Sequence, residues 1–178
     1  MNEVYGKLYN NALKGDPDCG GVLAYNYISG EPVTGLAEGR PLIVRSPNDK
    51  FNLANFIRTN LYATVAVLKL GNDVLFNEEQ VKVDRITGHG GLFKTPGVGQ
   101  RILAAALNSP ISVMETAGEG GAWGIALLAA FCVNNPEERN LADWLEKEVF
   151  AGNTGVEIAP TPEDVAGFNK YIEIYKAG

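Results

Sequence analysis

Three glycines lie within four residues at one point of the chain: Gly88, Gly90 and Gly91. Glycine accepts a positive φ and lets a ligand approach the backbone closely. The residues before them read as a strand, and Thr95 and Pro96 after them are typical of a helix start. Free N–H groups in such a turn, with the positive end of the following helix, bind anions such as the phosphates of a nucleotide. The same pattern is equally typical of a tight strand-to-helix turn that holds no ligand.

Two better-known phosphate-binding loops do not fit this segment. A P-loop needs glycine directly before its lysine and serine or threonine, but here Phe93 precedes Lys94 and Thr95. A dinucleotide-binding loop that begins at Gly88 needs its third glycine at the position of Phe93. The sequence therefore supports neither a Walker-type NTPase nor a Rossmann dehydrogenase.

A second glycine-rich segment, residues 115–124, includes Gly118 and Glu119 and leads into an apolar stretch. Small residues at a helix start let that helix pack closely on a neighbouring element, and we favour this role over direct ligand contact. Glu115 and Glu119 are four residues apart and can in principle hold a metal ion. Acidic residues at a helix N-terminus are common for dipole reasons alone, which is the favoured interpretation.

His89 is the only histidine of the chain. No cysteine or second histidine lies beside it, which argues against a zinc site. No serine or cysteine pairs with it in a pattern typical of nucleophilic catalysis. A structural role in the loop is therefore favoured, and an enzyme built around His89 is the alternative.

The composition indicates one soluble domain over residues 1–178. Apolar residues make up 46% and charged residues 20%, as in ordinary globular proteins, and the net charge of −6 disfavours nucleic acid or an anionic membrane as partner. We expect Cys19 and Cys132 to be buried thiols in a reducing compartment rather than a disulfide. The start is not a signal peptide, and the longest apolar run, residues 122–133, is too short to span a bilayer. We therefore expect a cytoplasmic protein.

Strand and helix patterns alternate along the chain, which predicts an α/β fold. Strands are expected at residues 22–28, 41–45, 81–86, 111–113 and 156–158, the last as an edge strand. Helices are expected at residues 4–13, 46–71, 95–107, 122–133, 141–150 and 161–177. Ser46 and Pro47 predict the start of the long second helix, whose apolar face is marked by Leu53, Ile57, Leu61, Val65 and Leu68.

Three blocks in the same order resemble the C-terminal domain of the FGGY carbohydrate kinases, above all their xylulokinase-like members. They are residues 20–31 with a Ser-Gly-Glu turn, residues 86–96 with the glycine loop, and residues 117–130 with the glycine-rich helix start. The resemblance covers nearly the whole chain, from about residue 4 to residue 150 and less clearly beyond. It implies an actin-like ATPase domain of the ribonuclease-H-like kind, an α/β fold with a central mixed sheet flanked by helices.

The resemblance also implies a function. In this family the C-terminal domain binds ATP, Mg²⁺ comes with the ATP phosphates, and the sugar binds mainly to an N-terminal domain. The γ-phosphate goes to a hydroxyl of a pentulose, most often D-xylulose, in xylose metabolism, and the full-length protein can form a homodimer. No residue is assigned to a metal. By resemblance, ATP lies against Gly88, Gly90, Gly91, Lys94, Thr95, Gly118 and Glu119.

This chain departs from the family in two ways. Many members have a shorter glycine loop, so the residues around Leu92 and Phe93 leave the register of the nucleotide open. The family's Gly-Asp-Asn/Gln motif, whose aspartate deprotonates the sugar hydroxyl, does not occur here, and Asp16 and Asp18 do not match it. We therefore expect the ATP-binding half of a sugar kinase, with no catalytic residue and inactive alone. The alternative is a non-catalytic module of the same fold that serves regulation or assembly.

Overall fold

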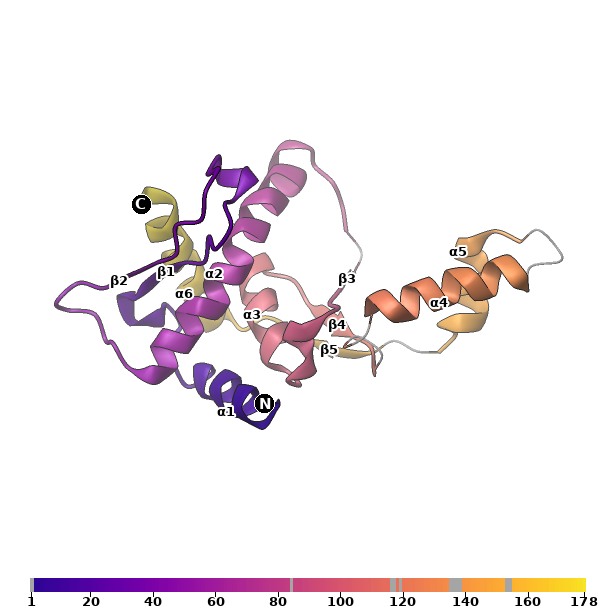
Figure 1. Ribbon diagram of the computed structural model, residues 1–178, viewed down its shortest axis with the longest axis horizontal. Helices are drawn as coiled ribbons and strands as arrows, with labels where there is room; N and C mark the ends of the chain where they lie inside the picture. Colours follow the sequence, from indigo (N-terminus) through magenta and orange to yellow (C-terminus); the bar gives the residue numbers. More distant parts are fainter. Residues whose placement is uncertain (1, 84, 116–117, 119, 135–138, 153–154) are drawn as a thin grey trace.

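A computed structural model describes residues 2–178 except 84, 116–117, 119, 135–138 and 153–154. Most of the chain forms one body, and an arm projects away from it (Figure 1). The arm consists of α4 (Gly120–Val133), α5 (Leu141–Trp144) and a π-helical turn, Leu145–Val149. The other described elements belong to the body.

The described residues of the body contain two small sheets. Strands β1 (Leu23–Tyr25) and β2 (Leu42–Val44) pair antiparallel, with Ala24 opposite Ile43. The second sheet has the order β3-β4-β5, in which β3 (Ile86–Thr87) is parallel to β4 (Ile111–Val113), and β4 is antiparallel to β5 (Val156–Ile158). This confirms the mixed sheet and the edge position of residues 156–158.

Four helices surround these sheets: α1 (Asn2–Ala12), α2 (Leu53–Asp73), α3 (Val98–Leu107) and α6 (Pro162–Ala177). A π-helical turn, Val74–Glu78, extends α2, and short 3₁₀ turns occur at Cys19–Gly21, Pro32–Thr34 and Gly91–Lys94. Figure 1 shows α2, α3 and α6 side by side in the body. The predicted α/β class with helices flanking a mixed sheet is confirmed.

The core lies where α2, α3 and α6 meet β1 and β4. Rings from two helices pack edge to face there, with Tyr62 of α2 4.8 Å from Phe168 and 5.2 Å from Tyr171 of α6 between ring centroids. Edge-to-face aromatic pairs of this kind add to the stabilisation from area burial. The largest fully buried side chains are Tyr62, Tyr171, Phe168, Ile102 and Ile111.

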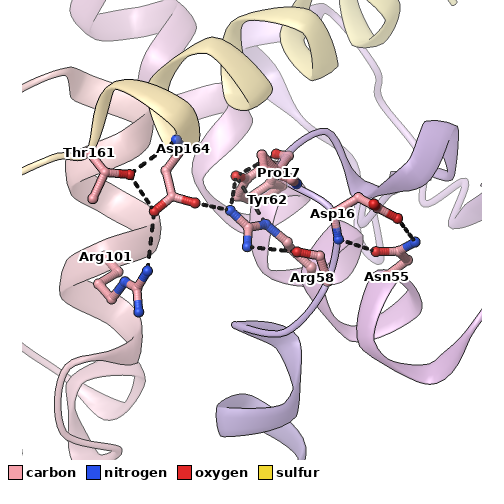
Figure 2. Close-up of polar contacts among 9 residues, drawn as sticks. Asp16, Pro17, Asn55, Arg58, Tyr62, Arg101, Thr161 and Asp164 are labelled. Atoms are coloured by element: carbon pink, nitrogen blue, oxygen red, sulfur yellow. Dashed lines mark hydrogen bonds and ion pairs between the residues drawn. The ribbon is translucent and has the colours of Figure 1, made fainter.

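A buried ion pair joins α2 to α6 (Figure 2). The Arg58 guanidinium, 4% exposed, donates to the Asp164 carboxylate at 2.5 Å and to the Tyr62 hydroxyl at 2.8 Å. Arg101 of α3 lies 3.4 Å from the other oxygen of Asp164, which also accepts from the Thr161 hydroxyl at 2.9 Å. Three helices therefore share one carboxylate.

The pKa of Asp164 reflects this environment. Burial by itself raises the pKa of the Asp164 carboxyl, but hydrogen bonds from Arg58 and Thr161 and the positive charges of Arg58 and Arg101 outweigh burial. The net pKa therefore lies below its ordinary value of 3.8. Asp164 is a carboxylate at neutral pH, and Arg58 does not lose its partner there.

The long second helix begins later than predicted. Asn52, not Ser46, caps α2, because its side-chain oxygen accepts the Asn55 N–H at 2.9 Å. Ser46 instead donates its N–H and hydroxyl to the Asp49 carboxylate, at 2.5 and 2.8 Å, in a separate turn. The predicted helix start at Ser46 and Pro47 is therefore wrong.

The buried face of α2 also differs from the predicted one. Leu61 and Val65 are buried as expected, but Leu53 is 55% and Leu68 is 48% exposed. The first half of the helix packs on the loop before β1 and therefore buries polar residues that reach its backbone: Asn55, Arg58 and Thr59. Hydrogen bonds replace apolar contact on this part of the face.

The arm contrasts with this body. Helix α4 is almost wholly apolar, yet none of its residues, all of which are described, is buried. Ile125 is 69% and Val133 is 81% exposed, while Phe131 packs on Trp144 of α5 at 5.4 Å between ring centroids. No helix in the described residues is long and apolar enough to cross a membrane.

Candidate functional site

The two glycine-rich segments meet at one edge of the sheet. Strands β3 and β4 are parallel, with Thr87 opposite Ser112, and α3 connects them. Parallel strands joined by a helix place their carboxyl ends at the same edge, where α/β proteins bind ligands. The Gly88 N–H donates to the Ser112 carbonyl at 2.8 Å and so continues the ladder into the first loop. The topology, not the glycines themselves, brings the loops together.

A cleft of about 740 Å³ lies between these loops. Phe93 and Lys94 line it from the first loop, and Glu115 and Gly118 line it from the second. Val156 and Ile158 of β5 form its far wall. Its size is within the range of small-molecule sites, and it offers apolar walls, one cation and one carboxylate.

Two of the predicted glycines leave open space at the surface. Gly90 has φ +101° and ψ −173°, a backbone conformation that only glycine adopts readily. A side chain at Gly90 or Gly91 would meet no atom within 4 Å. Both positions can therefore admit a ligand close to the backbone.

The third glycine has a packing role instead. Gly88 is buried, and a Cβ there would lie 2.3 Å from the ring of Phe93. A Cβ on Gly99 would likewise lie 2.9 Å from Leu92. Glycine at these two positions makes room for Leu92 and Phe93.

The loops also touch one another through side chains. The aliphatic part of Lys94 lies against Gly118, where an added Cβ would be 3.3 Å from Lys94 Cγ. The His89 ring lies against Gly120, where an added Cβ would be 3.0 Å from Nδ1. His89 is exposed at the loop surface. Small residues in the second loop thus permit contact with the first loop, whereas the expected close packing of the helix that follows is not seen, because α4 buries none of its residues.

The start of α3 differs from the prediction. The N-cap residue is Gly97, with φ +77°, and no side chain caps the amides of the first turn. The backbone of Thr95 is extended, and it is the Thr95 carbonyl that accepts the Val98 N–H, at 3.4 Å. The predicted cap at Thr95 and Pro96 is therefore wrong. The positive end of the α3 dipole still points to the cleft, which Pro96 and Gly97 line.

Sequence reasoning missed Gln100. This side chain is 5% exposed, and its Nε2 donates to the Ile111 carbonyl at 2.9 Å and the Val156 carbonyl at 2.7 Å. It thereby fixes α3 to β4 and β5 at the floor of the cleft. A glutamine inside an otherwise apolar helix face was the signal available in the sequence.

The predicted site residues thus fall into groups. Lys94 and Gly118 line the cleft, and Gly90 and Gly91 lie open in the adjoining loop. Thr95 follows Lys94 in the same turn, and Gly88 is covered by Phe93. Glu119 lies outside the described residues. Among the described residues no three His, Cys, Asp or Glu side chains are placed to hold a metal ion.

Residues 3–133 match the C-terminal domain of the FGGY family of carbohydrate kinases. The chain therefore belongs to this family of kinases. A comparison with curated protein sequences gives no match.

Solved structures show the same fold. Xylulose kinase from Rhodospirillum rubrum superposes with a TM-score of 0.68 at 17% identity, over 97% of this chain and 33% of that one. Ligand-bound xylulose kinase from Lactobacillus acidophilus superposes with a TM-score of 0.75 at 19% identity, over 96% of this chain and 33% of that one. Glycerol kinase from Plasmodium falciparum, solved with ADP, superposes with a TM-score of 0.69 at 18% identity, over 96% of this chain and 32% of that one. The chain thus spans about a third of the length of these kinases, whose domain fold it shares.

Proposed function

We propose that this chain is the ATP-binding part of a sugar kinase that phosphorylates a pentulose, D-xylulose above all others. The observation that carries the proposal is the cleft between the two glycine-rich loops, at the carboxyl ends of parallel strands. Family membership supports the reaction class, and the xylulose kinases among the structural neighbours support the sugar. Gluconate and glycerol kinases share the fold as well, so the assay below is needed to identify the substrate.

The residues present suit a nucleotide. The apolar walls, among them Phe93, Val156 and Ile158, suit an adenine ring, and the open backbone at Gly90 and Gly91 suits close approach of ribose or phosphate. Lys94 and the uncapped start of α3 supply positive potential for phosphate oxygens. In this proposal Mg²⁺ arrives with the ATP phosphates and neutralises their charge, and no residue of this chain is assigned to it.

The proposal assigns positioning of ATP, and not proton transfer, to this chain. Phosphoryl transfer depends on alignment and charge stabilisation, so the sugar and the base must be held in line with the phosphate. We assign both to the two thirds of the related kinases that have no counterpart here. The absence of a Gly-Asp-Asn/Gln motif from this sequence supports that division.

Calorimetry with MgATP tests the nucleotide site. Gly91→Val adds a side chain in the open loop, and Lys94→Gln removes the cation; each is expected to weaken binding about tenfold. Gly71→Val is the matched control, because Gly71 also has open space around it but lies on α2, away from the cleft. Equal affinity of the Gly91 and Gly71 variants would contradict the assignment, as would no binding by any of the proteins.

A coupled assay of ADP release tests the division of labour. The chain alone, with MgATP and D-xylulose, is expected to release ADP at the rate of the buffer. Full-length protein that includes a sugar-binding domain is expected to turn over D-xylulose faster than gluconate or glycerol. Turnover by the chain alone would show that it holds its own base, and a preference for another sugar would overturn the assignment to D-xylulose.

A further inference from the structure

A second cavity, of about 480 Å³, lies in a different part of the body. Its walls come from β1, β2, α2 and the end of α6, whereas the ATP cleft is built from the other sheet and α3. Leu36, Leu42 and Leu70 give it an apolar lining, and three tyrosines contribute the rest of one wall. The proposed kinase function makes no use of this cavity.

Two hydrogen bonds connect the three tyrosines, and the second of them ends at the Tyr27 hydroxyl. The Tyr25 hydroxyl donates to the Tyr175 carbonyl at 2.8 Å, and the Tyr175 hydroxyl donates to the Tyr27 hydroxyl at 2.6 Å. The proton of Tyr27 has no acceptor among the described residues, although the residue is only 8% exposed. Buried donors are normally satisfied, so this open end calls for an acceptor from outside the chain.

Burial favours the neutral, proton-bearing form of the Tyr25 and Tyr175 phenols. It raises the pKa of Tyr175, and hydrogen bonding to Tyr27 raises that pKa further. Burial also raises the pKa of Tyr25. The Tyr25 and Tyr175 hydroxyls therefore remain donors at neutral pH. Because the Tyr175 hydroxyl donates to Tyr27, the Tyr27 hydroxyl is left to donate to another group.

Two cationic residues, Arg40 and Lys176, line the same cavity as this donor. The Arg40 N–H donates to the Tyr27 carbonyl at 2.6 Å, which fixes residue 40 next to residue 27, and Arg40 lines the cavity. Its guanidinium makes no ion pair with any carboxylate that the structure describes. Lys176 also lines the cavity, and its exposed pair with Glu173 at 3.2 Å is weak. A guanidinium and a hydroxyl donor together match a carboxylate.

We propose that this cavity binds a small aromatic carboxylate. The carboxylate accepts from the Tyr27 hydroxyl and the Arg40 guanidinium, and the ring lies between the leucines and the tyrosine rings. The volume is in the range of small-ligand sites, and a flat apolar body with a single anionic end uses each wall of the cavity. A nucleotide does not suit it, because the lining offers two cations but no glycine-rich backbone.

Calorimetry with benzoate as the probe tests this site. The wild-type chain is expected to bind benzoate, and benzyl alcohol, which has the ring without the charge, at least about tenfold more weakly. Arg40→Gln and Tyr27→Phe are each expected to weaken benzoate binding by at least about tenfold. Arg45→Gln is the matched control, because the Arg45 guanidinium lies over the Phe51 ring at 5.0 Å, outside the cavity. It is expected to leave affinity unchanged.

The deciding variant is Arg40→Gln, because residue 40 is exposed and its side chain can change without unfolding the chain. Absence of benzoate binding to the wild type overturns the proposal. Equal binding by the wild type, Arg40→Gln and Arg45→Gln also overturns it. MgATP affinity measured on the same proteins is expected to stay constant, so failure here is distinguishable from failure of the kinase proposal.

Discussion

Helices α6 and α4 are similar in length, with 16 and 14 residues, but their burial is the reverse of what their composition suggests. Helix α6 carries many polar residues, yet it buries Phe168, Tyr171 and Ile172 against the body. Helix α4 is almost wholly apolar, yet it buries nothing in the described structure. Burial is decided by the partner face that the fold supplies, and apolar composition alone does not create one.

The largest difference between body and arm is expected from their ion pairs. Arg58→Met leaves Asp164 buried without its main partner, and we expect a loss of about 3–5 kcal/mol in the free energy of unfolding. Arg139→Met breaks the pair with Glu148 in the arm, where the two side chains are 34% and 52% exposed. We expect a loss of about 1 kcal/mol or less there, because solvent screens the pair. Urea denaturation of both variants measures the two losses, and equal losses would contradict the contrast.

Two isoleucines give a matched test of packing. Ile172→Ala in α6, where the side chain is 3% exposed, is expected to cost about 2–5 kcal/mol. Ile125→Ala in α4, where it is 69% exposed, is expected to change the free energy of unfolding by less than about 0.5 kcal/mol. Thermal and urea unfolding compare the two. A large loss at Ile125 would show that the arm is packed on another surface in solution.

The two cysteines allow the body and the arm to be compared without any mutation. Cys19 is fully buried in the body, and burial raises the pKa of its thiol, whereas Cys132 is exposed on α4. The expectation that both are buried is thus right for Cys19 and wrong for Cys132. We expect a disulfide reagent to label Cys132 at least about a hundredfold faster, because Cys19 reacts only after local opening. Peptide mapping over time identifies the labelled residue, and comparable rates would show an open core.

The smallest expected effect is a pH dependence in the body. Folding lowers the pKa of Asp164 below its ordinary value of 3.8. The carboxylate therefore stabilises the folded state at pH values above 3.8, and this stabilisation is lost as the pH falls through the lower pKa of the folded state. The stability gap between wild type and Asp164→Asn is therefore expected to narrow from about pH 6 to about pH 3. Urea midpoints at both pH values measure the gap. A constant gap would mean that the ionised form of Asp164 is not what α6 depends on.

Much of the fold follows from local patterns. Residues 111–113 and 156–158 form strands as predicted, and α6 begins at Pro162 after the Thr161 cap, because strong turn chemistry bounds these elements. The predicted strand 81–86 shrinks to Ile86–Thr87 among the described residues, since only this end reaches β4. Ser46 and Asn52 are both good helix caps, and packing of the loop near Asn55 selects the second.

The site was predictable in part. The glycine pattern located both loops, but only the parallel pairing of β3 and β4 makes them neighbours. Gly88 and Gly91 look alike in the sequence. Only the position of the Phe93 ring, which covers Gly88 and not Gly91, shows that the first has a packing role and the second is open to a ligand. Pairwise contacts of this kind are long-range and leave no periodic signal in a single sequence.

The contact between Tyr25 and Tyr175 has a consequence for how the chain is made. These residues are 150 positions apart, so β1 leaves the ribosome long before the helix that covers it. At about 5–20 residues per second, the delay is roughly 8–30 s. During this time the aromatic face of β1 and α2 is available to chaperones. The body can therefore close only when its last helix has been synthesised.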